Sequence, residues 1–321
     1  MASRRSLFDL WEMARQLDLY TSLGALPPGR TWSIMTEIRD AELAVFEQED
    51  LAAYASQARL SLELAPAVAG VWDVERVAAD FARYMCTRYF DCVFLGIYAK
   101  AIGSDRALLS AFGTTRDRRH LDDALAGGGA ILLPLHMGPY PCILPLVAAE
   151  MPVTTLLQAS AEADFGRIVT QYLPSIDLEM IGMPDRRILL RCLQAIRAGR
   201  LLVMFPEFSW GIDQPKLRLP LLGATVEAPS GAAVLAQRTG RRLVPCTIGR
   251  DGPGHYELRY HPPIGVEPGD AGIRDAVTAV FSVVTDEVMR RPGEWQGWDF
   301  FDVMVASDRP PVPLSERVRD R

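Results

Sequence analysis

Short apolar segments alternate with helical segments from residue 130 onward, and this alternation limits the folds available to the chain. Residues 130–135 are apolar throughout and follow three consecutive glycines, which is typical of a buried strand. Further strands are predicted over residues 153–158, 201–205, 242–248 and 256–260, and helices over 141–149, 185–198, 230–239 and 271–290. Such an order predicts an α/β fold, with a mostly parallel central sheet flanked by helices.

The preceding part of the chain has helical periodicity. Over residues 74–99, apolar side chains such as Val77, Phe81 and Met85 recur at helical spacing, and charged residues occupy the other faces. We therefore expect residues 1–110 to form a helical N-terminal layer, residues 111–308 an α/β core, and residues 309–321 a polar tail. The layer and the core are expected to form one structural domain.

Composition excludes several classes of protein. Hydrophobic residues make up 49% of the chain and charged residues 23%, which argues against disorder. The formal net charge of −6 argues against a general nucleic-acid binder, which needs a basic surplus. No apolar run approaches the roughly 18 residues of a membrane span, and the first residues mix apolar and charged side chains. We expect a cytoplasmic protein without integral membrane contact.

The five cysteines do not indicate a metal site or a disulfide framework. They are widely spread, and no two of them form a CxxC pair or lie in a cluster with histidine. We expect reduced, mostly buried thiols, no metal and no tightly bound cofactor.

His136 is the strongest candidate for catalysis. It directly follows the apolar run 130–135, at the strand end where open α/β sheets place their active sites. An imidazole titrates near neutral pH and is suited to act as a general base. Gly138 permits a tight turn and close approach by a ligand, and Tyr140 follows in the same loop. The alternative is a structural histidine that hydrogen-bonds a backbone carbonyl.

A second candidate segment follows the predicted strand 201–205. Glu207 and Ser209 can orient a base or bind the polar part of a substrate, and Asp213 and Arg218 lie shortly after them. Glu207 can equally serve as a helix-cap partner or a solvated loop acid.

A third segment opens the predicted helix 230–239. Ser230 and Gly231 begin this helix, whose unpaired N–H groups can receive an anion. Helix capping and close packing explain the same two residues.

Together and in this order, the segments resemble the lysophospholipid acyltransferase superfamily, closest to the lipid A biosynthesis lauroyl/myristoyl acyltransferase branch. The resemblance spans roughly residues 70 to 300. The matching stretches are His136-Met137-Gly138-Pro139-Tyr140, Phe205-Pro206-Glu207, Leu221-Leu222-Gly223, Gly231-Ala232-Ala233-Val234-Leu235-Ala236-Gln237-Arg238-Thr239-Gly240, Val244-Pro245 and Arg291-Pro292-Gly293-Glu294-Trp295-Gln296-Gly297-Trp298. Phe205-Pro206-Glu207 is also similar to an acceptor-binding motif of glycerophosphate acyltransferases.

The resemblance implies an acyltransferase in which His136 is the general base, but one element of the family pattern is missing. The family pairs its histidine with an acid five residues later, and here that residue is Pro141. Three interpretations follow: another acid, Glu207 or Asp213, replaces it in space; His136 works without an acid on an intrinsically nucleophilic amine, hydroxylamine or hydrazine; or the chain has lost catalysis and only binds.

The substrates expected for this chain also differ from those of the lipid A enzymes. Lipid A enzymes usually begin with a transmembrane helix, whereas this chain begins with a mixed, charged segment. We therefore expect a small acceptor, acylated at an amine or hydroxyl, and a thioester donor carried by an acyl carrier protein or coenzyme A. Specialised metabolism is the expected setting. Backbone N–H groups near Gly138, or at the start of the helix at Ser230 and Gly231, are expected to bind the oxyanion.

Arginines on the predicted helix 185–198 suggest a further contact. Arg187 and Arg191 share a helix face, where they can meet phosphates of coenzyme A, of a phosphopantetheine arm or of an aminoacyl-tRNA, or form a solvated face. Tyr84, Tyr89, Phe90 and Phe94 can line an acyl pocket or pack in the core.

Two alternatives to acyl transfer from a carrier thioester remain. The first is an aminoacyl transferase with an aminoacyl-tRNA donor, which predicts a continuous basic track to His136. The second is a non-catalytic acyl- or partner-binding protein, which predicts a fully buried His136 tied to backbone, with no acid in reach and no open tunnel.

Overall fold

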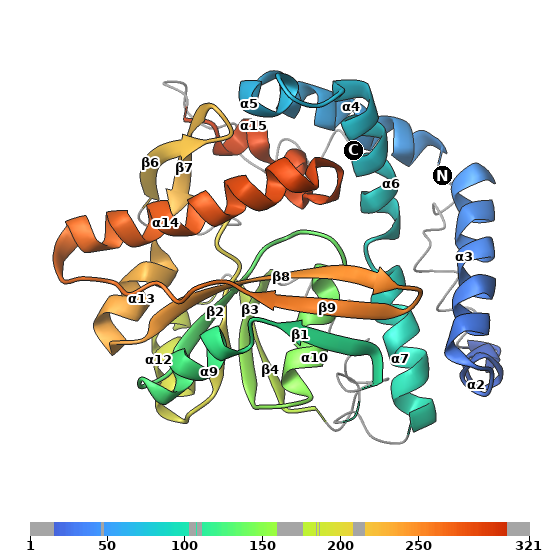
Figure 1. Ribbon diagram of the computed structural model, residues 1–321, viewed down its shortest axis with the longest axis horizontal. Coiled ribbons are helices and arrows are strands. Elements are labelled where there is room, and N and C mark those ends of the chain that lie inside the picture. The colour runs from blue at the N-terminus through green and yellow to red at the C-terminus, as the bar shows by residue number, and fades with distance from the viewer. Residues whose placement is uncertain are drawn as a thin grey trace.

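The fold is described by a computed structural model covering residues 16–45, 48–102, 107, 111–158, 176–183, 185, 187–207 and 216–306, without the side chains of residues 100–102. Its centre is a seven-stranded sheet with the strand order β1-β9-β8-β2-β5-β3-β4 (Figure 1). The strands are β1 (Gly113–Arg116), β2 (Ala130–Pro134), β3 (Val153–Gln158), β4 (Leu178–Met183), β5 (Leu201–Val203), β8 (Arg242–Gly252) and β9 (His255–Tyr260). Strands β8, β2, β5, β3 and β4 are parallel, and β9 returns antiparallel to β8. The predicted α/β class is confirmed.

Helices cover both faces of the sheet. The helices of the core are α9 (Arg119–Ala126), η2 (Tyr140–Cys142), α10 (Ile143–Ala148), α12 (Ile188–Arg197), α13 (Gly231–Thr239), α14 (Gly269–Arg290), η3 (Pro292–Glu294), η4 (Gln296–Asp299) and α15 (Phe301–Met304). Along β2, Leu132 packs in one apolar cluster with α9 and α10, whereas Ile131 and Leu133 pack in another with α12, α13 and α14. This alternation explains why β2 is apolar at every position.

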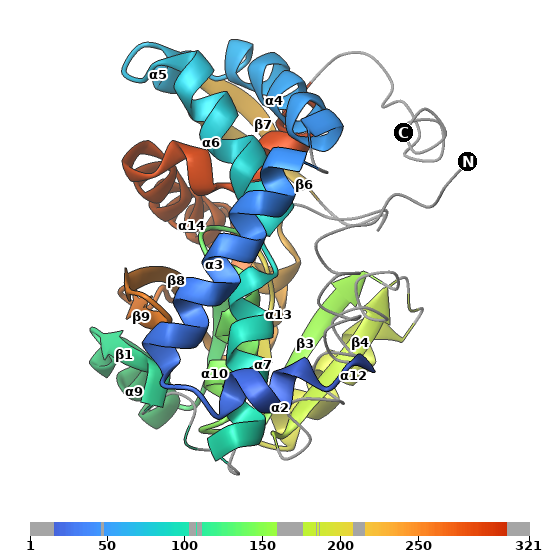
Figure 2. The same cartoon turned by 90° about the vertical axis from the view of Figure 1, so that its right-hand side faces the viewer.

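The N-terminal layer is helical, as expected. It comprises α2 (Leu19–Gly24), α3 (Pro28–Val45), α4 (Gln48–Glu63), α5 (Pro66–Ala69), α6 (Val74–Thr87) and α7 (Phe90–Ile102). The helical pattern over residues 74–99 divides into two helices, because the chain breaks at Arg88 and Tyr89. Helix α3 runs alongside α6 and α7 on the outside of the molecule (Figure 2).

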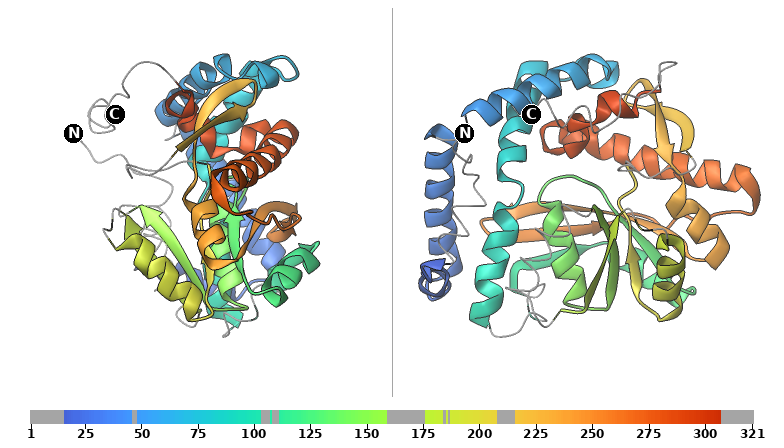
Figure 3. Two further views of the ribbon diagram at one scale, coloured as in Figure 1. Left: turned by 90° about the vertical axis from the view of Figure 1, so that its left-hand side faces the viewer. Right: turned by 180° about the vertical axis from the view of Figure 1, so that it is seen from behind.

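A small antiparallel hairpin, β6 (Lys216–Leu221) and β7 (Ala224–Pro229), was not among the expected strands. It packs on α14 and α15 rather than joining the main sheet (Figure 3). Among the described residues, no helix combines the length and apolar character needed to cross a bilayer. All five cysteines are free thiols, and four of them are buried.

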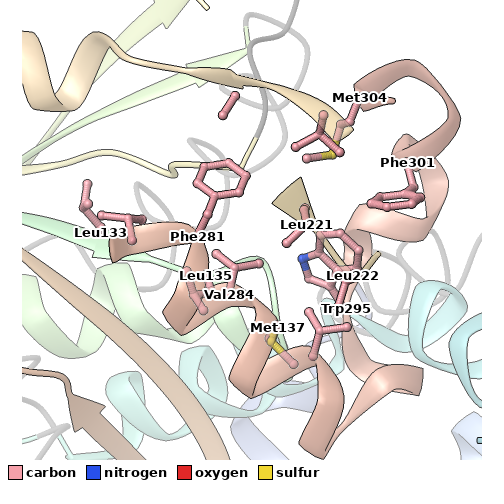
Figure 4. Packing of buried hydrophobic residues seen from close by; sticks show 14 of the residues in the cluster. Leu133, Leu135, Met137, Leu221, Leu222, Phe281, Val284, Trp295, Phe301 and Met304 are labelled. Carbon is pink, nitrogen blue, oxygen red and sulfur yellow. The ribbon is translucent and has the colours of Figure 1, made fainter. Parts of the chain in front are cut away.

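The loop that follows β2 is fixed by alternate side chains. Leu135 and Met137 are fully buried in the second apolar cluster, together with Trp295 and Phe281 (Figure 4). Met137 also forms an antiparallel bridge with Trp295. The Met137 N–H donates to the Leu135 carbonyl at 2.7 Å, so the backbone turns tightly at His136, between these two buried residues.

Candidate active site

His136 lies immediately beyond the carboxyl end of β2, and 12% of its side chain is exposed. The Leu135 N–H donates to the Cys246 carbonyl at 3.0 Å, which extends the pairing of β2 with β8 by one residue. The histidine is thus held by the sheet and by its buried neighbours, while its ring remains accessible.

Glu207 holds both the backbone and the ring of His136. Its Oε1 accepts the His136 backbone N–H at 2.7 Å, and its Oε2 lies 2.9 Å from Nδ1. The carboxylate side chain is fully buried. A carboxylate only accepts hydrogen bonds, so Nδ1 carries the proton and the lone pair of the neutral ring is on Nε2.

The sheet topology explains how residues 71 positions apart form this pair. Strand β5 lies beside β2, in register at Leu132 and Val203, and Glu207 follows β5 by four residues. Pro141, the residue at the family's acid position, lies in η2 and has no carboxylate. Glu207 therefore places a carboxylate against His136 in space, whereas the family pattern has its acid five residues after the histidine. Asp213, the other acid named above, and Ser209 lie outside the described residues.

Two aromatic rings enclose the imidazole. The ring centroid of Phe205 lies 4.2 Å from that of His136, and Tyr140 meets it edge-on at 4.9 Å. Burial raises the pKa of the Tyr140 phenol, which is therefore neutral beside the base. The ring contact of Tyr140 places it beside His136, as its predicted role requires. Phe205 was missed as a site residue, although it stands in the quoted triplet Phe205-Pro206-Glu207.

Gly138 occupies a position that only glycine fits. Its φ is +56°, and a Cβ would lie 2.8 Å from the Ile248 carbonyl oxygen and 3.2 Å from Glu294 Oε2. The Gly138 N–H donates to the Glu294 carbonyl at 3.0 Å, and the Gln296 N–H donates to the His136 carbonyl at 2.9 Å. The segment 294–296 therefore lies against the histidine loop and fixes it, a role that sequence reasoning did not assign.

These contacts correct one expectation. The backbone N–H groups of His136, Met137, Gly138 and Tyr140 already donate to acceptors within the protein, namely Glu207, the Leu135 carbonyl, the Glu294 carbonyl and the Gly138 carbonyl. A backbone oxyanion site near Gly138 is therefore not supported. The start of α13 remains as the predicted oxyanion donor.

An apolar pocket of about 40 Å³ lies between this helix start and the residues that follow β5. Its wall combines Phe205 and Pro206 with Gly231, Ala232 and Ala233 at the start of α13, and Val277, Val280 and Phe281 of α14 complete it. Ser230 is buried just before α13. The first turn of α13 lines the same pocket as Phe205, whose ring contacts His136.

Other predicted binding residues lie elsewhere. Arg218 is exposed on β6, opposite Glu227 of β7. Arg191 forms ion pairs with Glu179 and Asp185, each at 3.3 Å, so its charge is already balanced. Arg187 is exposed just before α12, which begins at Ile188 rather than at residue 185. The structure brings none of these three into a described contact with His136 or Glu207.

The aromatic residues of α6 and α7 have different surroundings. Phe90 and Phe94 are buried and pack edge-on against Trp32, at 5.1 and 5.0 Å, so they belong to the core. Tyr84 is buried, and Tyr89 is half-buried beside Arg88. The apolar pocket beside His136 is thus lined by a different set of residues from the one named above.

A comparison with curated proteins finds no match. The family model for bacterial lipid A biosynthesis acyltransferases matches residues 90–298, which contain His136, Glu207 and the segment that holds their loop. The chain belongs to the bacterial lipid A biosynthesis acyltransferase family.

Proposed function

We propose that the protein transfers an acyl group from a thioester, carried by an acyl carrier protein or coenzyme A, to an amine or hydroxyl of a small acceptor. The observation that carries this proposal is the His136–Glu207 pair at the end of β2. A buried carboxylate that fixes Nδ1–H leaves the Nε2 lone pair to accept a proton, which is the arrangement that general-base catalysis needs.

In the proposed reaction, Nε2 of His136 removes a proton from the acceptor as its nitrogen or oxygen attacks the thioester carbonyl. The tetrahedral oxyanion is stabilised by N–H groups of the first turn of α13. The carbon–sulfur bond then breaks, and the departing sulfur takes the proton from the imidazolium. Glu207 stabilises the imidazolium while the proton is on the ring.

The apolar pocket supports the placement of the acyl group. Phe205 forms part of its wall and also contacts the imidazole, so an acyl chain in this pocket has its carbonyl near the base. At about 40 Å³ the pocket is small, so a long chain requires side chains to move.

Two features bear on the alternatives. A non-catalytic binder was expected to bury His136 fully with no acid in reach, whereas the ring is partly exposed and Glu207 contacts it. For an aminoacyl-tRNA donor, the arginines of α12 were the expected contact, and Arg191 is already paired with two acids. Acyl transfer from a carrier thioester to a small acceptor in specialised metabolism is therefore the function we propose.

The test is product formation with purified protein. The protein is incubated with acyl-carrier and coenzyme A thioesters and a panel of amines and alcohols, and products are measured by mass spectrometry. We expect an acylated product with wild-type protein, and its loss in His136→Ala with the circular dichroism spectrum retained. Full activity of His136→Ala would remove this residue from the mechanism.

A further inference from the structure

An arginine stands at the break between α6 and α7, which follow one another down one side of the molecule (Figure 1). Arg88 is half-buried, and its Nη1 donates to the Met85 carbonyl at 2.7 Å. Its guanidinium carbon lies 5.0 Å from the centroid of the Tyr89 ring. Arg88 also hydrogen-bonds the phenols of Tyr54 and Tyr89, so its partners are neutral, and no carboxylate oxygen of the described residues lies within 4.0 Å of it. Arg250 of β8, by contrast, has a carboxylate partner in Asp91.

One turn earlier on α6, Tyr84 has a hydroxyl without a partner. The side chain is 9% exposed, and within the described part of the chain its buried oxygen has no hydrogen bond. A buried hydroxyl without a partner costs about 1–3 kcal/mol. Positions four apart lie on the same side of a helix, so this hydroxyl and Arg88 are directed to the same side of α6.

The break between α6 and α7 lies near the candidate active site, because the Sγ of Cys92, four residues after Arg88, is 3.6 Å from that of Cys142, which is in η2 with Tyr140. Burial raises the pKa of Tyr140 and the nearby Tyr89 adds to the effect, while the positive charge of Arg88 opposes it. Burial likewise raises the pKa of Tyr84, with Tyr140, Glu294 and Glu207 adding to the effect and Arg88 opposing it. Tyr140, on which the Arg88 charge acts, contacts the His136 ring.

We propose that Arg88 and the Tyr84 hydroxyl bind a carboxylate of the acceptor, the same molecule whose amine or hydroxyl His136 deprotonates. This inference rests on the proposed function. A guanidinium provides two parallel N–H donors that match a carboxylate, and the phenol adds a third donor. One cation matches a singly charged carboxylate, whereas a phosphate dianion would leave excess negative charge near Glu207. The acceptor is thus an amino or hydroxy carboxylic acid.

Binding is tested first, without turnover. The free energy of unfolding is measured by urea denaturation with common amino and hydroxy acids, with their methyl esters, and with inorganic phosphate. A ligand that binds only the folded protein raises this free energy. We expect at least one acid, but not its ester, to stabilise the wild type, and Arg88→Gln to lose the effect. Arg83→Gln, an exposed arginine of the same helix, is expected to retain it.

Turnover is tested second. We expect a stabilising acid to be acylated with a higher kcat/KM than its ester. Arg88→Gln should raise the KM for the acid about 10- to 100-fold, the effect of one charge-assisted hydrogen bond, with kcat and ester acylation little changed. Tyr84→Phe, which retains the ring, should raise the same KM by a smaller factor.

The outcomes separate the two proposals. Carboxylate-dependent stabilisation without any transfer would contradict the proposed function but support the carboxylate site. Equal acylation of acids and esters, or equal stabilisation of wild type and Arg88→Gln, would overturn the carboxylate site alone. Stabilisation by phosphate and by none of the acids would also overturn it, in favour of a phosphate-bearing ligand.

Discussion

At the scale of single residues, the site depends on groups that position His136 as much as on the imidazole. Both carboxylate oxygens of Glu207 contact His136, so Glu207 fixes the ring and the backbone of that residue together. Gly138, two residues after the base, brings the loop so close to Ile248 and Glu294 that no side chain fits there. A base that must meet a substrate within hydrogen-bond distance needs this kind of support.

Gly138→Ala should therefore impair catalysis and stability together. Both Gly138 and Gly240 have positive φ, but a Cβ at Gly240 meets no atom within 4 Å. Gly240→Ala thus carries only the backbone cost, about 1–2 kcal/mol, with normal activity. We expect Gly138→Ala to lose more unfolding free energy in urea and to lose turnover. Equal losses of stability in the two variants, with normal turnover in both, would contradict the crowding that the structure indicates.

How far these residues could be predicted from sequence varies. His136 was found because it follows an apolar run bounded by glycines, a local signal. Its pairing with Glu207 was one of several open alternatives, because an acid 71 positions away carries no spacing signal. Phe205 and Arg88 were missed, since a ring against an imidazole and an unbalanced cation are defined only by tertiary neighbours.

At the scale of elements, adjacent strands bring the base and its acid to one edge of the sheet. Strands β2, β3, β5, β8 and β9 were predicted from their apolar or alternating runs, whereas β1 and β4 were not. The strand order β8-β2-β5-β3-β4, which makes β2 and β5 neighbours, was not predicted either. The β6–β7 hairpin was missed because Arg218 was interpreted as a binding residue that follows Glu207. Alternation of polar and apolar side chains over Lys216–Leu221 is the strand signal that was present there.

The segment after α14 acts as a support for the histidine loop. Arg291 Nη1 lies 3.1 Å from Glu294 Oε2 and 3.3 Å from the Ile248 carbonyl oxygen, and so joins this segment to β8. Its neighbour Arg290 pairs with Glu287 at 2.7 Å, and the Arg290 side chain is more exposed than that of Arg291. The two arginines are therefore a matched pair for testing the support.

Arg291→Ala is expected to lower kcat for acyl transfer, with a smaller effect on KM, because His136 loses its fixed position. Arg290→Ala removes an ion pair to Glu287 and should leave kcat unchanged. Steady-state kinetics of both variants provides the measurement. If the two variants have the same kcat, the segment that follows α14 does not position the base.

At the scale of the whole molecule, the N-terminal layer and the C-terminal segment are packed together. The Ser61 hydroxyl of α4 donates to the Trp298 carbonyl at 2.6 Å, and the indole N–H of Trp72 donates to the Met289 carbonyl at 3.0 Å. A helical layer was predictable from periodicity, whereas its attachment to residues more than 200 positions away depends on tertiary packing. The division into residues 1–110, 111–308 and 309–321 stays a prediction.

A buried histidine gives the folded protein a predictable response to acid. Burial, with the positive charges of Arg259 and Arg290, lowers the pKa of His261 to about 4. Below about pH 6.5 the unfolded chain binds a proton that the folded protein does not, so stability falls as pH drops. The loss is complete below about pH 4 and amounts to about 3 kcal/mol at most.

His261→Gln should reduce this dependence on pH. Glutamine does not titrate, so the unfolding free energy of the variant should fall less steeply than that of the wild type between about pH 6.5 and 4. Urea denaturation across this range measures it, and His255→Gln, at a more exposed position, provides the control. Parallel pH profiles for wild type and His261→Gln would show that His261 does not titrate differently in the folded protein.

The central claim, that Glu207 replaces the missing acid, is tested most directly by the turnover of Glu207→Gln. Glutamine can still accept the His136 backbone N–H, but its amide donates to Nδ1 and so favours the tautomer with the proton on Nε2, which cannot act as a base. We predict a kcat about 10²- to 10⁴-fold below that of the wild type, with the fold retained. An unchanged kcat would contradict the account.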